Sequence, residues 1–420
     1  MSASSAEILG KPLTLPNGSV IRNRFAKSAM SEAIATIDNR VTRNLVELYR
    51  RWAEGGTGLL ITGNVMIDKR HVGEPNNVVL ENDRDRDLLK AWADAGTRNG
   101  TQLWMQLNHP GKQSPKMLNR DPVAPSAIPF GKALQGAFAT PRPLTEAEIE
   151  EIIERFATSA QLAKQTGFTG VQIHGAHGYL VSQFLSPHHN QRTDSWGGSL
   201  ENRMRFVVRV YEAMRSATGK DFNIGIKLNS ADFQRGGFTE EESMVVAETL
   251  SGLGMDMIEI SGGTYEAPRM AKGYEVSGGE PVKESTRQRE AYFLEYAEKI
   301  RDRVSAPLMV TGGFRHSDVM AEAVASGATD LVGLARPLVI DPELPNRILA
   351  GESVVSTVRP IRTGVSAIDR MGLMETAWYA RQLARMGKGK DPHPQDSGFW
   401  SLLDVIWTMS QRGFRTKLRA

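Results

Sequence analysis

Polar side chains that could carry out acid–base chemistry are concentrated in one short segment. His174, His177 and Tyr179 follow directly after an apolar run. Two neutral imidazoles can donate hydrogen bonds to one substrate oxygen and polarise a carbonyl group, and a tyrosine beside them can supply a proton. The histidines could instead ligate a metal, but a catalytic zinc site needs a third protein ligand, and no obvious one is nearby. We therefore expect His174 and His177 to bind substrate and Tyr179 to act as a general acid.

A lysine interrupts a later apolar run, where Lys227 stands within residues 224–228. A buried cation is costly unless it meets a negative group. Lys227 is therefore expected to face either an electron-rich cofactor atom or an acidic side chain of another strand.

Glycines and an arginine follow the last two apolar runs. Gly312 and Gly313 come after the seventh run, and Ala335 and Arg336 come after the eighth. In (β/α)₈ barrels these two loops often bind phosphate through backbone N–H groups. The pattern indicates a phosphorylated ligand; tight turns with a surface arginine are the alternative.

These residues need a scaffold that brings strand ends together, and the sequence predicts one. Eight short apolar runs alternate with eight longer amphipathic segments. The expected strands are 25–28, 59–62, 103–107, 171–174, 224–228, 257–261, 308–311 and 330–333. The expected helices are 43–55, 83–99, 145–166, 201–217, 239–253, 290–303, 317–326 and 342–350. Near-continuous apolar strands that alternate with helices predict an α/β protein with a (β/α)₈ TIM barrel. An open doubly wound sheet is less consistent with the sequence, because no G-x-G-x-x-G turn follows a strand.

Two long connections and a C-terminal segment depart from this rhythm. Residues 108–144 and 262–289 follow strand ends, so we expect them to form lids or substrate walls, with surface excursions as the alternative. We divide the chain into a barrel domain, 1–355, and a C-terminal helical extension, 356–420. The extension carries several aromatic residues, which favours packing across the outside of the barrel or against a second copy of the chain as a homo-oligomer.

Composition excludes several classes of protein. Of the 420 residues, 40% are hydrophobic and 24% are charged, as in a soluble globular protein. The net charge of +3 is too small to predict nucleic-acid binding. The chain has no cysteine, which rules out disulfides, thiolate nucleophiles and iron–sulfur clusters. We find no targeting signal and expect a cytoplasmic protein with no membrane association.

Several segments resemble the old yellow enzyme family. The central match is VQIHGAHGYL (171–180), QFLSP (183–187) and NQRTDSWGGSLENR (190–203). Shorter matches are NRF (23–25), AMS (29–31), GLLIT (58–62), QLNHPG (106–111), APS (124–126) and the two loops after the last strands. The resemblance covers roughly residues 8–350. It implies an FMN-dependent oxidoreductase on a (β/α)₈ barrel that is reduced transiently by NADH or NADPH.

The resemblance also implies a role for individual positions. The implied cofactor-binding residues are Ala29, Met30, Ser31, Asn64, Gln106, Lys227, Gly312, Gly313, Ala335 and Arg336. Gln106 would hydrogen-bond the flavin ring edge, and the loops after the last two strands would hold the FMN phosphate. His174 and His177 would clamp the activating oxygen of an α,β-unsaturated substrate. Tyr179 would protonate Cα after hydride reaches Cβ.

Three positions depart from the family pattern. Lys227 stands where the family has an arginine beside flavin N1 and the C2 carbonyl, and it lacks the two-pronged arginine fork. We therefore expect a shifted flavin potential. Ser31 replaces a threonine or cysteine near the flavin C4 carbonyl, and Ala29 replaces a proline.

Four functions are consistent with the sequence. The leading one is an FMN-dependent ene-reductase for activated C=C bonds of small-molecule enones, enals, maleimides or nitro compounds. The others are a flavin-dependent dehydrogenase or demethylase, a metal-dependent barrel that uses His174 and His177, and a catalytically silent scaffold.

Overall fold

The computed structural model describes residues 3–132, 134–262, 293–359, 361, 373–401 and 403. Eight parallel strands form a closed barrel, because β7 pairs with both β4 and β10. They are β3 (Phe25–Lys27), β4 (Leu59–Ile61), β7 (Gln102–Asn108), β10 (Gly170–Gly175), β11 (Asn223–Asn229), β12 (Met257–Ser261), β13 (Leu308–Thr311) and β14 (Leu331–Leu334). All eight predicted strands are confirmed, each within a few residues of its expected bounds.

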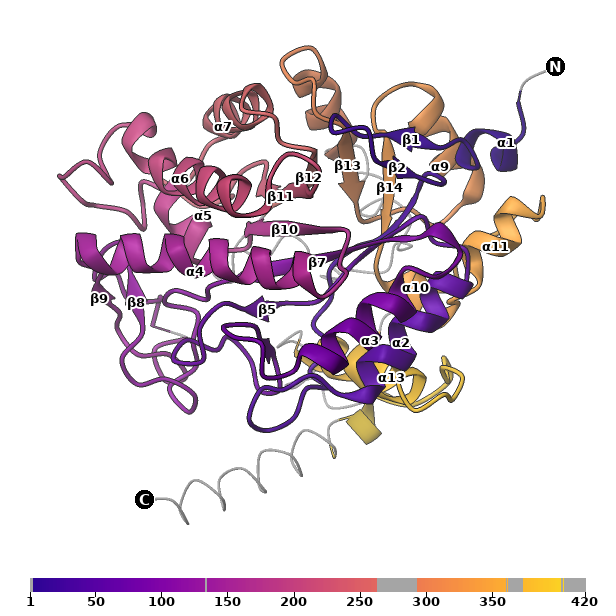
Figure 1. Ribbon diagram of the computed structural model, residues 1–420, viewed down its shortest axis with the longest axis horizontal. Helices are drawn as coiled ribbons and strands as arrows, with labels where there is room; N and C mark the ends of the chain where they lie inside the picture. Colours follow the sequence, from indigo (N-terminus) through magenta and orange to yellow (C-terminus); the bar gives the residue numbers. More distant parts are fainter. Residues whose placement is uncertain are drawn as a thin grey trace, which may run out of the picture.

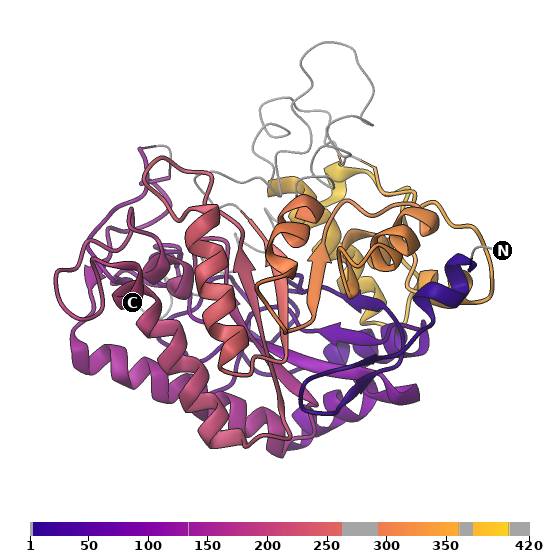
Figure 2. The same ribbon diagram turned by 90° about the horizontal axis from the view of Figure 1, so that it is seen from above.

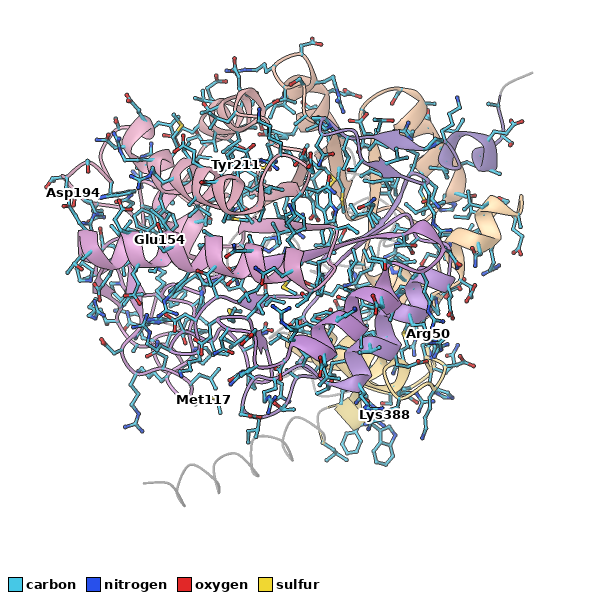
Figure 3. The ribbon with its side chains drawn as sticks, viewed as in Figure 1. Arg50, Met117, Glu154, Asp194, Tyr211 and Lys388 are labelled. Carbon is cyan, nitrogen blue, oxygen red and sulfur yellow. The ribbon has the colours of Figure 1, made fainter. Side chains whose placement is uncertain are left out.

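Helices surround the barrel and cover the outer faces of its strands (Figures 1 and 2). The longer ones are α2 (Arg43–Glu54), α3 (Arg86–Gly96), α4 (Glu146–Gln165), α6 (Leu200–Thr218), α7 (Glu240–Gly252), α9 (Ser317–Ala325) and α13 (Leu373–Met386). The shorter ones are α1 (Ser5–Leu9), η1 (Arg98–Gly100), α5 (Leu180–Leu185), α10 (Arg336–Ile340) and α11 (Leu344–Leu349), and residues 293–301 are also helical. Charged side chains such as Glu154 of α4 and Arg50 of α2 lie on their outward surfaces (Figure 3). No helix in the described ranges is long and apolar enough to cross a membrane.

Two of the helices begin with reciprocal caps that the sequence predicts. The side chain of Thr145 accepts from the backbone of Glu148, and the glutamate accepts in return. Thr239 and Glu242 form the same capping box at the start of α7. These caps satisfy N–H groups that have no partner within the helix.

Short strands outside the barrel were not predicted. β1 (Leu13–Thr14) and β2 (Val20–Ile21) form an antiparallel hairpin, and β8 (Val123–Ala124) pairs with β9 (Arg142–Pro143) within the 108–144 connection. β5 (Val65–Met66) pairs with the end of β7 and with β6 (Val78–Val79). Each has only two residues, too few to give a periodic signal. The predicted 262–289 connection lies almost entirely outside the described residues.

The interior of the barrel is apolar at its N-terminal end. Leu13 and Ile21 of the β1–β2 hairpin pack in one buried cluster with Trp104, Met257 and further side chains from inside the barrel. This hairpin therefore closes one end with hydrocarbon, so polar chemistry is restricted to the carboxyl ends of the strands.

The C-terminal extension packs against the barrel in its described part. Helix α13 contacts α2 and α10, and Trp378 is buried. Packing across the outside of the barrel, one of the two expected arrangements, is therefore confirmed for α13. Residues 360, 362–372, 402 and 404–420 of the predicted extension lie outside the described residues.

Two glycines make room for the largest side chain inside the barrel. A Cβ added to Gly225 or to Gly170 would lie 2.7 Å from the Trp104 ring, closer than two carbon atoms can pack. We predict that Gly225→Ala lowers the free energy of unfolding by about 2 kcal/mol through overpacking. Urea unfolding should show a smaller loss when the same change is made in a Trp104→Phe background. An equal loss in both backgrounds would contradict this steric account.

Candidate active site

The three residues predicted to act on substrate lie together at the end of β10. The His174 ring centroid is 4.7 Å from that of Tyr179 and 5.2 Å from that of His177. The turn depends on left-handed backbone, with φ of 59° at His177 and 76° at Gly178. Left-handed backbone is uncommon for a residue other than glycine and occurs often at functional sites.

The hydrogen bond to His174 indicates which of its ring nitrogens carries the proton. The backbone N–H of Ala176 donates to His174 Nδ1 at 3.3 Å, so the proton of a neutral His174 is on Nε2. His177 Nε2 lies 2.7 Å from the Ser261 hydroxyl. Burial, with the nearby charge of Lys227, lowers the pKa of His177 to about 3, and burial lowers the pKa of His174 well below its usual range. Both imidazoles are therefore neutral at physiological pH.

The Tyr179 hydroxyl belongs to a hydrogen-bonded chain that includes two side-chain amides. Asn64 Nδ2 donates to the Tyr179 hydroxyl at 3.4 Å, and Asn108 Nδ2 donates to Asn64 Oδ1 at 3.3 Å. Tyr179 itself is only 4% exposed. The structure thus places the predicted cofactor residue Asn64 in contact with the predicted proton donor.

Lys227 makes an ion pair with a neighbouring strand, one of its two predicted environments. Its Nζ lies 2.9 Å from Glu259 Oε1 of β12. Glu259 also accepts from Gln172 Nε2 at 2.8 Å, and Gln172 accepts from Gln106 Nε2 at 2.8 Å. The predicted residues Gln106 and Lys227 are therefore joined by two residues that the sequence analysis missed. An acidic residue inside the apolar run 257–261 was the available signal.

The loops predicted to hold phosphate are neighbours. Thr311 pairs with Gly333, so the ends of β13 and β14 are adjacent. Gly312 and Gly313 have φ of 107° and 85°, which only glycine adopts readily. Arg336 follows Ala335 at the end of β14 and makes a 3.3 Å ion pair with Glu375 of α13.

The segment after β3 meets the segment after β4. A Cβ added to Gly63 would lie 2.2 Å from the Met30 carbonyl oxygen, so Met30 packs directly against the residue before Asn64. Ala29 and Ser31 flank Met30, and the Ser31 hydroxyl donates to Glu74. Burial raises the pKa of Glu74 to about 7, against an opposing hydrogen bond from Asn77.

A second buried ion pair supports these segments from behind. Lys27 of β3 lies 3.6 Å from Glu32 and donates to the Ile61 carbonyl at 2.8 Å. Glu32 accepts from the backbone N–H of Gly63 at 2.9 Å and from the Tyr49 hydroxyl. Burial lowers the pKa of Lys27 to about 8, although Glu32 favours its charged form. Neither Lys27 nor Glu32 was singled out from the sequence.

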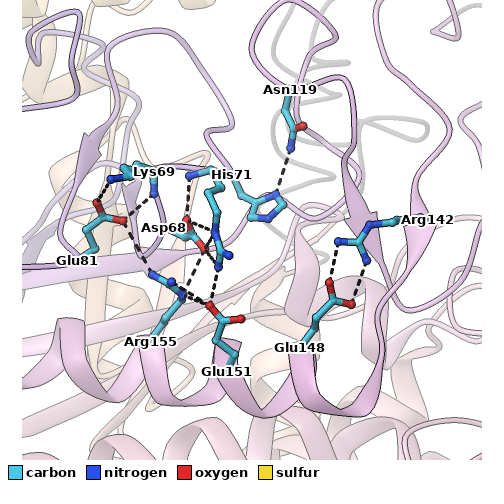
Figure 4. Close-up of polar contacts among 10 residues, drawn as sticks. Asp68, Lys69, His71, Glu81, Asn119, Arg142, Glu148, Glu151 and Arg155 are labelled. Atoms are coloured by element: carbon cyan, nitrogen blue, oxygen red, sulfur yellow. Dashed lines mark hydrogen bonds and ion pairs between the residues drawn. The ribbon is translucent and has the colours of Figure 1, made fainter.

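An ionic network joins the segment around Asp68 to helix α4 (Figure 4). Arg70 bridges Asp68 to Glu151 of α4, and Arg155 of α4 lies 3.3 Å from Asp68. Burial disfavours the charge of Asp68, but hydrogen bonds from Arg70 and the charge of Arg155 hold its pKa at about 2. A Cβ added to the nearby Gly73 would lie 3.8 Å from the Tyr179 ring. The network therefore anchors a segment that packs against the predicted acid.

This network borders a cavity of about 230 Å³ that is lined by α4 and the 119–144 connection. Arg142 pairs with Glu148 and Asp121 at its edge. None of the predicted site residues lines this cavity. In the described ranges, no group of three or more histidine, cysteine, aspartate or glutamate side chains could hold a metal ion.

The sequence matches the NADH:flavin oxidoreductase / NADH oxidase family over residues 9–353. The chain belongs to this family. The match covers the whole barrel, and the predicted relationship to old yellow enzyme is confirmed. The family supports FMN as the cofactor and a nicotinamide as the reductant.

Two fungal members and one solved structure show the extent of the similarity. The NADH-dependent flavin oxidoreductase iccE of Talaromyces variabilis is 36% identical over 90% of this chain and 98% of its own length. The NADH-dependent flavin oxidoreductase iliE of Neonectria sp. (strain DH2) is 40% identical over 80% of this chain, which spans only 46% of that relative. Morphinone reductase in complex with tetrahydroNAD superposes with a TM-score of 0.68 and 25% identity, over 84% of this chain and 92% of the reductase.

The residues at the barrel mouth fit the FMN of this family. Gln106 and Lys227 supply N–H donors suited to ring oxygens, and the Gly312–Gly313 loop lets backbone approach a phosphate. Asn108 Oδ1 is buried at the end of β7 with no hydrogen-bond partner in the described part of the chain, as expected of an acceptor that a ligand satisfies.

We predict that neither His174 nor His177 becomes charged between pH 5 and pH 8. Their lowered pKa values mean that protonation begins only well below pH 5, because burial penalises the imidazolium form. Nitrogen-15 NMR of histidine-labelled protein should show neutral rings for both across this range. An imidazolium signal that is lost in His177→Asn or His174→Asn protein at pH 6 would contradict the prediction.

Proposed function

We propose that this protein is an FMN-dependent ene-reductase that reduces activated C=C bonds of α,β-unsaturated carbonyl or nitro compounds. The observation that supports it most is the group formed by two neutral imidazoles and a tyrosine at one strand end. Such a group can bind a carbonyl or nitro oxygen and supply a proton, without any charged acid. The reductant is a nicotinamide, NADH or NADPH.

In this mechanism the chain binds substrate and delivers one proton. Bound FMN supplies hydride that it has received from the nicotinamide. The Nε2–H of His174 and the ring of His177 hydrogen-bond the substrate oxygen and draw electron density away from Cβ. The Tyr179 hydroxyl gives its proton to Cα, while Asn64 keeps the phenol in place through its 3.4 Å hydrogen bond.

We also propose a division of the chain into two parts, a class of substrate and a location. Residues 1–355 form the catalytic barrel, and residues 356–420 form an extension whose Glu375 supports Arg336 near the phosphate. We propose small-molecule substrates and a cytoplasmic location.

The proposed function can be tested from the colour of the purified protein. A yellow flavin band should bleach without oxygen when NADH or NADPH is added, and it should return when an enone such as cyclohexenone is added. A colourless protein that takes up no FMN would contradict the proposal. A band that recovers only in air would leave a flavoprotein but argue against the ene-reductase.

We predict that Tyr179→Phe slows oxidation of the reduced enzyme by enone about 100-fold or more, because a positioned acid typically contributes 10²–10⁴-fold. Flavin reduction by the nicotinamide should be unchanged within about twofold. Stopped-flow absorbance measures the two half-reactions separately. Equal losses in both would mean that Tyr179 supports the fold of the site and is not the acid.

A further inference from the structure

Glu259 is a buried acid inside the barrel, and side chains from three neighbouring strands contact it. Its side chain is fully buried. It lies 2.9 Å from Lys227 of β11 and accepts from Gln172 of β10 at 2.8 Å and from the Thr311 hydroxyl of β13 at 2.7 Å. A buried ion pair is weak evidence for a stabilising role, because apolar side chains of similar volume often serve stability as well or better. The arrangement therefore points to a role beyond folding.

The carboxylate fixes the direction of a hydrogen-bond chain. An ionised carboxylate can only accept hydrogen bonds, so the NH2 group of the Gln172 side-chain amide must face Glu259. The carbonyl oxygen of Gln172 then accepts from Gln106 Nε2 at 2.8 Å. The orientation of the Gln106 amide is thus set two residues away by the charge on Glu259.

The same carboxylate offsets the charge of Lys227. The Lys227 ammonium lies 2.9 Å from Glu259, and a carboxylate at this distance reduces the positive potential that Lys227 presents to its other neighbours. Screening by solvent is weak here because Lys227 is only 3% exposed.

We propose that Glu259 is a positioning residue for the flavin ring: it orients the Gln106 amide through Gln172 and offsets the charge of Lys227, which lowers the reduction potential of bound FMN. The inference rests on the proposed function, because it requires FMN at Gln106 and Lys227. Glu259 would thus be a second determinant of the flavin potential, in addition to the lysine at position 227 where the family has an arginine.

The decisive variant is Glu259→Gln, which removes the charge and keeps the shape. The reduction potential of bound FMN should become more positive, because Lys227 then stabilises the reduced anionic flavin without opposition. The dissociation constant of FMN, measured with flavin-stripped protein, should rise about fivefold to tenfold. The reason is that the Gln172 amide can then flip, which breaks its hydrogen bond with Gln106. Glu259→Asp, which keeps the charge, should recover most of the potential.

Asp256→Asn is the matched control. Asp256 is also a buried acid beside β12 with an arginine partner, 2.7 Å from Arg215, but it contacts neither Lys227 nor Gln172. Its variant should leave the flavin potential unchanged. Gln172→Leu serves as a second test if Glu259→Gln does not fold, since it keeps the Lys227–Glu259 pair. It should weaken FMN binding and shift the potential less.

The outcomes separate this inference from the proposed function. A Glu259→Gln protein that binds FMN with wild-type potential and affinity would overturn the inference, as would an equal shift of the potential in Asp256→Asn. Wild-type protein that takes up no FMN would instead overturn the proposed function, and the inference with it.

Discussion

The ion pair between Lys227 and Glu259 lies inside a closed barrel, where a lone charge would cost several kcal/mol. Closure leaves the eight barrel strands without a free edge, and the β1–β2 hairpin fills one end of the interior with hydrocarbon. Charged and amide side chains therefore persist only near the carboxyl ends of the strands, where they satisfy one another. Gln106, Gln172, Lys227 and Glu259 form a polar layer. It lies beneath the proposed substrate-binding residues.

The protonation states of the side chains above this polar layer depend more on burial than on neighbouring charges. The imidazoles of His174 and His177 stay neutral because the surrounding protein disfavours the imidazolium form. A neutral donor can bind a substrate oxygen without attracting anions in general. The same burial keeps Glu74 protonated up to about pH 7 beside Ser31. The site is thus largely uncharged around the proposed substrate-binding residues, and its buried ion pairs lie beneath and behind them.

The sequence predicts the barrel well because the expected strands are apolar runs of four or five residues that alternate with amphipathic segments. It also predicts which strand ends carry His174, Lys227 and Gly312, since parallel strands end at one rim. It does not predict Glu259 as the partner of Lys227, or Glu32 as the partner of Lys27. Those pairings depend on strand register and side-chain direction, which a period of two cannot specify across neighbouring strands. The two-residue strands escape prediction because they are too short to give a periodic signal.

Helix α4 holds two loop segments in place, although it contributes none of the predicted site residues. Through Glu151 and Arg155 it holds the segment around Asp68 and Arg70, and through Glu148 it holds Arg142 of the long connection. Two separate loop segments are thus tied to a single helix. Substitutions on the surface of α4 can accordingly shift both segments without changing any of the predicted site residues.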